Sequence, residues 1–133
     1  MKNKKNRGSR TKKTIKIVTE KFSIKALLNE TRTAEKLIEI LPTSSNVNRW
    51  GDEIYFSIPL NADIEDGVEE VDVGAVAFWP PGSALCIFFG PTPASTGDKP
   101  RAASPVTVIG NIIDTDAVNK LKETRDGEKI EVI

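Results

Sequence analysis

The sequence predicts a mainly β fold, a closed or nearly closed antiparallel β-barrel of about eight strands with one or two capping helices. Three observations lead to this prediction: short segments alternate apolar and polar residues, Pro- and Gly-rich turns separate them, and no strand–helix–strand alternation of the parallel type occurs. Closing the sheet would also remove exposed strand edges. With 133 residues, the chain is long enough for one domain with a substantial core.

The first half of the chain is expected to contain a hairpin, a helix and a strand. The alternation in residues 14–19 (TIKIVT) and 22–29 (FSIKALLN) predicts two paired strands. The spacing of apolar residues predicts a helix from Thr31 to Leu41, capped by Thr31 or Thr33 and followed by Pro42. After a polar connection, residues 50–60 (WGDEIYFSIPL) predict a turn and then a strand. Its two faces carry Ile54, Phe56 and Ile58 on one side and Glu53, Tyr55 and Ser57 on the other.

The second half reads as four further strands and a short helix. Residues 61–70 predict a solvated acidic loop. ALCIFFG, residues 84–90, is apolar on both faces, which indicates a strand covered on both sides. The remaining expected elements are a strand at 71–79, a turn at 80–83, strands at 105–112 and 128–133, and a helix at 114–122 capped by Asp114 or Thr115.

The charges are distributed unevenly along a chain whose formal net charge is zero. Residues 1–13 contain seven basic residues and no acidic one, so residues 14–133 carry a net charge of −7. We interpret residues 1–13 as a basic, disordered N-terminal arm and residues 14–133 as the barrel domain. The acidic body is not typical of a dedicated nucleic-acid-binding domain, and we expect only weak, nonspecific contact with nucleic acid through residues 1–13.

The absence of histidine excludes several kinds of site. Ser-His-Asp and Cys-His nucleophiles, His-ligated zinc and imidazole bases all require histidine. The single cysteine, Cys86, excludes an internal disulfide, and its apolar surroundings indicate a small buried side chain. We expect no cofactor, no metal and no catalytic residue set. No apolar stretch approaches the roughly 18 residues that span a bilayer, so we expect no membrane partner and a cytoplasmic location.

The segment between the apolar runs at 84–90 and 105–112, residues 90–105, is rich in Pro, Ala, Ser and Thr. Its prolines remove backbone donors that a phosphate-binding loop needs, and they stiffen the chain too much for a flexible linker. We therefore expect an ordered loop that rims a ligand-binding groove. The candidate ligand-binding residues are Glu53, Tyr55, Phe89, Thr92, Asp98, Arg101 and Ser104.

Three stretches, WGDEIYFSIPL, VDVGAVAFWPPGSALCIFFGPTP and PRAASPVTVIGNI, resemble a family of small, functionally uncharacterised prokaryotic proteins with a cyclophilin-like fold. The resemblance covers residues 14–133 and implies a compact barrel with a capping helix, from an archaeal or thermophilic source. True cyclophilins are prolyl isomerases that use an arginine, then a phenylalanine and a glutamine, with a tryptophan and a histidine elsewhere. The corresponding strand here, EIYFSIPL, has no arginine or glutamine, so this catalytic set is not matched.

The leading functional hypothesis is therefore a binding module for a small molecule or short peptide, in a groove rimmed by residues 90–105. One alternative is a divergent prolyl isomerase or other small enzyme that uses Arg101 with Asp98 or Glu53. The other alternative is a structural subunit that self-assembles into a homo-oligomer.

Overall fold

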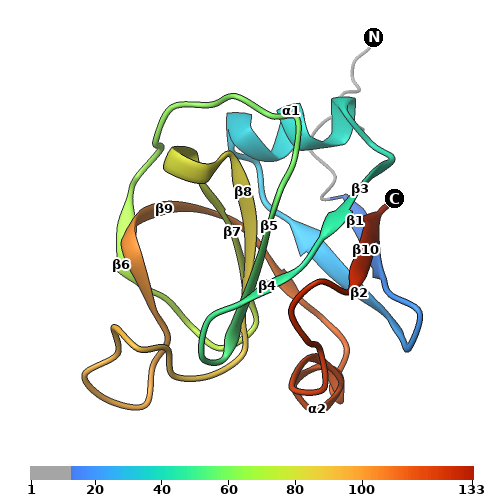
Figure 1. The fold of residues 1–133 in the computed structure, drawn as a ribbon. Coiled ribbons are helices and arrows are strands. Elements are labelled where there is room, and N and C mark those ends of the chain that lie inside the picture. Colours follow the sequence, from blue (N-terminus) through green and yellow to red (C-terminus); the bar gives the residue numbers. More distant parts are fainter. Residues whose placement is uncertain (1–12) are drawn as a thin grey trace, which may run out of the picture.

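The computed structural model describes residues 13–133, which form ten strands, two α-helices and one short 3-10 helix (Figure 1). The basic arm expected at residues 1–13 lies outside the described residues, apart from Lys13. No helix in the described part is long and apolar enough to cross a membrane. In chain order, the elements are β1 (Thr14–Val18), β2 (Ser23–Leu28), α1 (Arg32–Glu39), β3 (Thr43–Asn46), β4 (Asn48–Arg49), β5 (Glu53–Ser57), β6 (Val68–Glu70), β7 (Ala75–Trp79), the 3-10 helix η2 (Pro80–Gly82), β8 (Ala84–Phe88), β9 (Arg101–Ile112), α2 (Ala117–Leu121) and β10 (Lys129–Val132).

All the strand pairs are antiparallel, and the sheet curls back toward its own start. Its strand order is β3-β10-β1-β2-β9-β7-β8-β5-β4, with β6 paired to β9. The two ends of this order, β3 and β4, are separated in the chain only by Val47. Two hydrogen bonds join Val47 to the segment before β10. The Val47 N–H donates to the Glu128 carbonyl at 2.8 Å, and the Val47 carbonyl accepts from the Gly127 N–H at 2.7 Å. One continuous segment, residues 43–49, therefore joins the two ends of a barrel-like sheet.

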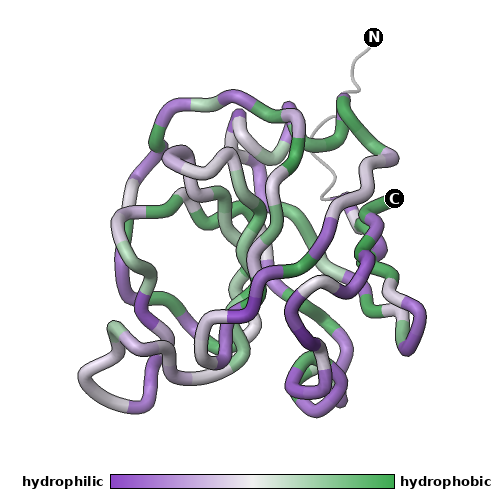
Figure 2. The backbone as a smooth tube through the Cα atoms, in the orientation of Figure 1, coloured by the Kyte–Doolittle hydropathy of each residue, from purple (hydrophilic) through white to green (hydrophobic). Residues whose placement is uncertain are grey.

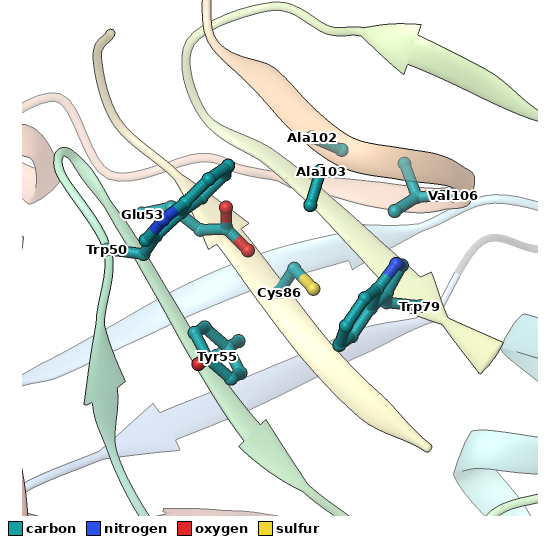
Figure 3. Close-up of a pocket in the computed structure, with 8 residues that line it drawn as sticks. All are labelled: Trp50, Glu53, Tyr55, Trp79, Cys86, Ala102, Ala103 and Val106. Atoms are coloured by element: carbon teal, nitrogen blue, oxygen red, sulfur yellow. The ribbon is translucent and has the colours of Figure 1, made fainter. Parts of the chain in front are cut away.

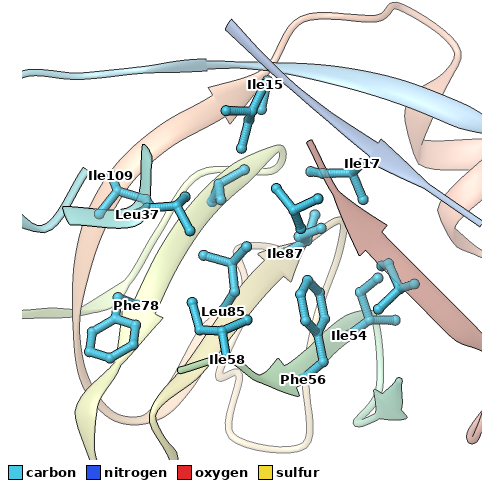
Figure 4. Packing of buried hydrophobic residues seen from close by; sticks show 14 of the residues in the cluster. Ile15, Ile17, Leu37, Ile54, Phe56, Ile58, Phe78, Leu85, Ile87 and Ile109 are labelled. Atoms are coloured by element: carbon cyan, nitrogen blue, oxygen red, sulfur yellow. The ribbon is translucent and has the colours of Figure 1, made fainter. Parts of the chain in front are cut away.

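The main core fills the inside of this curled sheet (Figure 4). Ile54, Phe56, Phe78, Leu85 and Ile87 contribute to it from β5, β7 and β8, and each is at most 1% exposed. Helix α1 covers it with Ala34 and Leu37, and the Thr31 hydroxyl caps that helix by accepting a hydrogen bond from the Ala34 N–H at 3.1 Å. Figure 2 shows the same distribution along the chain, with hydrophobic positions in the central strands.

A second, smaller apolar cluster lies on the opposite face of β7 and β8. Alternate residues of these strands, among them Ala77, Cys86 and Phe88, pack there against Ala102 and Val106 of β9. Strand β9 reaches this face because it is 12 residues long. Its C-terminal half pairs with β2 and β7, whereas its N-terminal half pairs with β6. This arrangement gives β8 two covered faces, as the sequence predicts.

The structure confirms the predicted first hairpin, the helix, and the strands at 53–58, 84–90 and 128–133, with boundary shifts of a few residues. The strand predicted at 71–79 begins at Ala75, and the helix predicted at 114–122 spans Ala117–Leu121, with Asp116 at its N-cap and no side-chain cap. Three further segments differ from the prediction. The polar connection before Trp50 contains β3 and β4, because its Thr, Ser and Asn residues pair with β10 and β5. The acidic loop ends in β6, which pairs with β9. The loop predicted to extend to residue 105 ends earlier, because β9 begins at Arg101.

Candidate functional site

A pocket lies between the outward face of β5, β8 and β7 and the first half of β9 (Figure 3). Its volume is about 180 Å³. Eight residues line it: Trp50, Glu53, Tyr55, Trp79, Cys86, Ala102, Ala103 and Val106. All of the tryptophan and tyrosine residues of the chain, two and one respectively, belong to this set.

Strand register explains why a hollow forms here. Cys86 of β8 lies at the centre of the outward face, where it pairs with Tyr55 of β5 on one side and Ala77 of β7 on the other. Small side chains at the centre leave space that the larger aromatic side chains around them enclose. Ala102, Ala103 and Val106 of β9 bound the opposite side, as Figure 3 shows.

A tight turn at residues 50–53 places Trp50 and Glu53 at the edge of the pocket. The two residues exchange backbone hydrogen bonds, at 2.9 Å from the Trp50 N–H and 3.2 Å from the Glu53 N–H. Gly51 has φ +62°, and a Cβ atom there would lie 2.8 Å from Pro93 Cδ. A glycine is therefore required both for the left-handed backbone and for the close approach of the 91–93 segment.

The segment FFGPTP that carries the family resemblance packs directly on this turn. The Asp52 N–H donates to the Pro91 carbonyl at 2.9 Å, and the Phe89 N–H donates to the Asp52 carbonyl at 2.8 Å. A Cβ atom on Gly90 would clash with the Asp52 side chain. This motif therefore holds the 50–53 turn, and with it the pocket residues Trp50 and Glu53, in position.

Arg49 fixes the same turn from its other side. Its Nε donates to the Gly51 carbonyl at 2.5 Å, and its Nη2 lies 3.0 Å from Asp52 Oδ1. Its Nη1 donates to the carbonyls of Lys122 and Thr124, at 3.0 and 2.9 Å. The guanidinium also stacks 4.9 Å above the Phe89 ring. These contacts engage all three nitrogens of the guanidinium, so we assign Arg49 a structural role.

Trp79 is held in place by two neighbours. Its indole Nε1–H donates to Ser104 Oγ at 2.7 Å. Tyr55 packs edge-on against it, with 6.3 Å between ring centroids and 71° between ring planes. This is the geometry that aromatic pairs prefer, so the aromatic wall of the pocket is largely preorganised.

Glu53 is the one acidic carboxyl group among the pocket-lining residues, and it is only 5% exposed. Its Oε1 atom is buried and has no hydrogen-bond partner. Burial raises the pKa of Glu53 from 4.5 to about 7, against a smaller lowering by a hydrogen bond with Cys86. Burial, together with the nearby Glu53 carboxyl, also raises the pKa of the Cys86 thiol well above its usual value. Cys86 is therefore a neutral, buried thiol, and not a reactive thiolate.

The structure brings only part of the expected residue set together. Glu53 and Tyr55 line the pocket, and Ser104 supports it through Trp79. Phe89 is 2% exposed and belongs to the main core. The other three expected residues bind neighbouring groups or lie in the loop, and none of them lines the pocket.

Those three residues are Thr92, Asp98 and Arg101. Thr92 Oγ1 donates to the Arg101 carbonyl at 2.5 Å, which closes the 92–101 loop on itself. Asp98 is exposed in that loop. The Arg101 side chain forms an ion pair with Glu69 of β6, at 2.6 Å. Tyr55 therefore lines the pocket, whereas Asp98 and Arg101 do not.

Residues missing from the expected set include the two tryptophans, Cys86 and the β9 residues Ala102, Ala103 and Val106. The outward position of Trp79 was visible in the alternation of its strand. The contribution of β9 was not visible, because it depends on which strands pair. Within residues 13–133, no cluster of three or more Cys, Asp or Glu side chains has the spacing of a metal site.

Comparisons with known proteins identify the family of the chain. A family model described as Cyclophilin-like matches residues 13–133. The solution structure of a hypothetical protein from Archaeoglobus fulgidus superimposes with a TM-score of 0.75 at 38% identity, covering 91% of this chain and 93% of that one. No curated protein matches. With its barrel, its capping helix and this match over nearly its whole length, the chain belongs to the Cyclophilin-like family.

Proposed function

We propose that this protein is a binding module that takes a small organic molecule into the pocket between β5, β8, β7 and β9. The observation that carries the proposal is a preformed hollow with aromatic walls and one buried carboxyl group that has an unpartnered oxygen. Ligand sites are typically mostly apolar, with a few polar groups that orient the ligand. Burying the Glu53 oxygen without a partner destabilises the folded state, and a hydrogen bond from a ligand donor would offset that cost.

The volume of the pocket defines the size of the ligand. A dry cavity of about 150 Å³ accepts benzene, so about 180 Å³ suits a single ring with a short substituent. A short peptide would have to place one side chain here and leave the rest outside. We therefore favour a small molecule over a peptide.

A second hollow, beside Asp72 and Lys99, is larger, at about 560 Å³, but it is a less suitable site. An ion pair of 3.1 Å joins Asp72 to Lys99 within its lining. Both side chains are more than half exposed, and so is Val73 nearby. Such a surface is already solvated and paired, so it offers a ligand little burial.

An enzymatic function has less support from the geometry. The sequence-based alternative combined Arg101 with Asp98 or Glu53, and of these only Glu53 lines the pocket. A pairing of these groups in catalysis requires each of them to lie within hydrogen-bond reach of the reacting atoms, and Arg101 and Asp98 do not line the pocket. We expect no acceleration of proline isomerisation in a test peptide, and a rate above the thermal one would instead favour the isomerase alternative.

A fragment screen by ¹H–¹⁵N NMR tests the proposed function. Because both tryptophans line the pocket, the two indole N–H signals report on it directly. We expect some single-ring compounds to shift both indole signals in a saturable way. If a diverse panel of such compounds at millimolar concentration shifts neither signal, the proposal fails.

A matched pair of variants locates the binding. Ala103 is exposed and lines the pocket, so Ala103→Phe would fill the opening without disturbing the core. Lys16→Phe places the same side chain on an exposed position of β1, away from the pocket. We expect Ala103→Phe to abolish the indole shifts and Lys16→Phe to retain them. Equal shifts in both variants would place the binding elsewhere.

A further inference from the structure

Glu53 offers a specific interaction that the chain itself leaves unused. Its Oε1 atom is buried and without a partner, and none of the five ion pairs among residues 13–133 includes Glu53. No lysine or arginine lines the pocket. A buried carboxylate normally has a cation or several N–H donors around it. The missing partner is therefore a donor that comes from outside the described chain.

The walls of the pocket favour that donor being positively charged. Trp50, Tyr55 and Trp79 line the pocket together with the carboxyl group, and Figure 3 shows Trp50 beside it and Trp79 beyond Cys86. The faces of tryptophan and tyrosine rings attract cations. The rest of the lining is aliphatic or a neutral thiol. A negatively charged ligand would meet Glu53 without any compensating cation, so the lining excludes anions.

The unpartnered oxygen also distinguishes among cations. A quaternary ammonium carries charge but no N–H group, so it would leave Oε1 without a hydrogen bond. A primary ammonium supplies both charge and donors, and charge-assisted hydrogen bonds are the stronger kind. The available volume leaves room for about one ring beside that group.

From this geometry we infer that the ligand is a small primary amine with a single-ring or similarly sized apolar body, whose ammonium group pairs with Glu53 between the aromatic walls. This inference rests on the proposed function and specifies its ligand class. The apolar body would lie over Cys86 and against Ala102 and Val106 of β9.

The inference implies that affinity depends on pH. The other titratable groups that line the pocket are Cys86 of β8 and Tyr55 of β5, while β7 and β9 contribute Trp79, Ala102, Ala103 and Val106. With a pKa of about 7, Glu53 is mostly protonated at pH 6 and mostly ionised at pH 8. An ammonium ligand binds the ionised form, so its apparent affinity should rise about tenfold from pH 6 to pH 8.

Three matched probes test the ligand class: benzylamine, benzyl alcohol and benzyltrimethylammonium. The first has charge and donors, the second a donor without charge, and the third charge without a donor. Titrations would follow the two indole N–H signals at pH 8 in the full chain. We expect benzylamine to bind about tenfold or more tightly than either of the other two probes.

Glu53→Gln provides the control, because it removes the charge and keeps the shape. We expect it to weaken benzylamine binding about tenfold or more and to weaken benzyl alcohol binding much less, because the alcohol carries no charge. If this variant does not fold, the pH dependence of benzylamine binding to the unmodified protein provides the same test. Benzyl alcohol should show a much smaller dependence, because it lacks the charge.

The outcomes separate this inference from the proposed function. If benzyl alcohol shifts the indole signals as strongly as benzylamine, the pocket binds small molecules and the amine inference is overturned. If benzylamine binding is the same at pH 6 and pH 8 and survives Glu53→Gln, Glu53 is not its partner and the inference is again overturned. If no probe shifts either signal, the inference falls, and a negative result in the wider fragment screen would remove the proposed function as well.

Discussion

Replacing Glu53 with glutamine should make the protein more stable at alkaline pH. Glu53 is buried, and one of its carboxyl oxygens has no partner. A pKa raised from 4.5 to about 7 means that the folded state holds the proton more tightly than the unfolded state does. The contribution of this group to stability is therefore fully present below pH 4.5 and is lost as pH rises through about 7.

The size of the effect follows from the difference in pKa. Each pKa unit corresponds to about 1.4 kcal/mol, so ionising Glu53 costs the folded state about 3 kcal/mol at pH well above 7. Most of this loss, between about 2 and 3 kcal/mol, falls between pH 5 and pH 8.5. Other carboxyl groups also titrate, but they are shared by the variant, so the difference between the two proteins isolates Glu53.

The assay is urea unfolding followed by far-ultraviolet circular dichroism, for both proteins at pH 5 and pH 8.5. We expect the unfolding free energy of the unmodified protein to fall by about 2 to 3 kcal/mol more than that of Glu53→Gln. Equal pH dependence in the two proteins would mean that Glu53 titrates normally and is not desolvated. The interpretation of the pocket as a site with an unused carboxyl group would then be refuted.

Three further substitutions test the supports of the pocket. Gly90→Ala should destabilise the protein by about 1 to 3 kcal/mol in thermal unfolding, because the new methyl group clashes with Asp52 in the turn. Gly97→Ala is the control, and it should be nearly neutral because a methyl group there meets open space. Ser104→Ala should cost about 1 kcal/mol and speed hydrogen exchange at the Trp79 indole, and an unchanged exchange rate would contradict the hydrogen bond between them. Arg49→Lys should cost about 1 to 3 kcal/mol in urea unfolding, since lysine cannot reproduce the four-way contact of the guanidinium. A fully stable lysine variant would show that charge alone suffices there.

The sequence predicted the sheet well where side chains alternate strongly. Alternation placed Ile54 and Phe56 on one face and Glu53 and Tyr55 on the other. In the structure, the first face belongs to the main core and the second lines the pocket. The apolar run at 84–90 correctly indicated a strand covered on both sides. These features are local, because the alternation of side chains between the two faces can be recognised within the sequence of a single strand.

The sequence could not predict features that depend on pairing between distant segments. Strands β3 and β6 are short and polar, and they are strands only because β10 and β9 pair with them. The pocket needs β9 to lie across the outward face, and no local pattern encodes that position. For the same reason the sequence could not show that Thr92 and Arg101 are outside the pocket lining. The Thr92 hydroxyl binds the Arg101 carbonyl within the loop, and the Arg101 side chain pairs with Glu69.

The most direct test of the central claim is a crystal structure of the protein grown at pH 8 with benzylamine. We expect one molecule in the pocket, with its ammonium nitrogen about 3 Å from the Glu53 carboxylate and its ring between Trp50, Tyr55 and Trp79. An empty pocket at saturating benzylamine, or benzylamine bound only outside it, would contradict the claim.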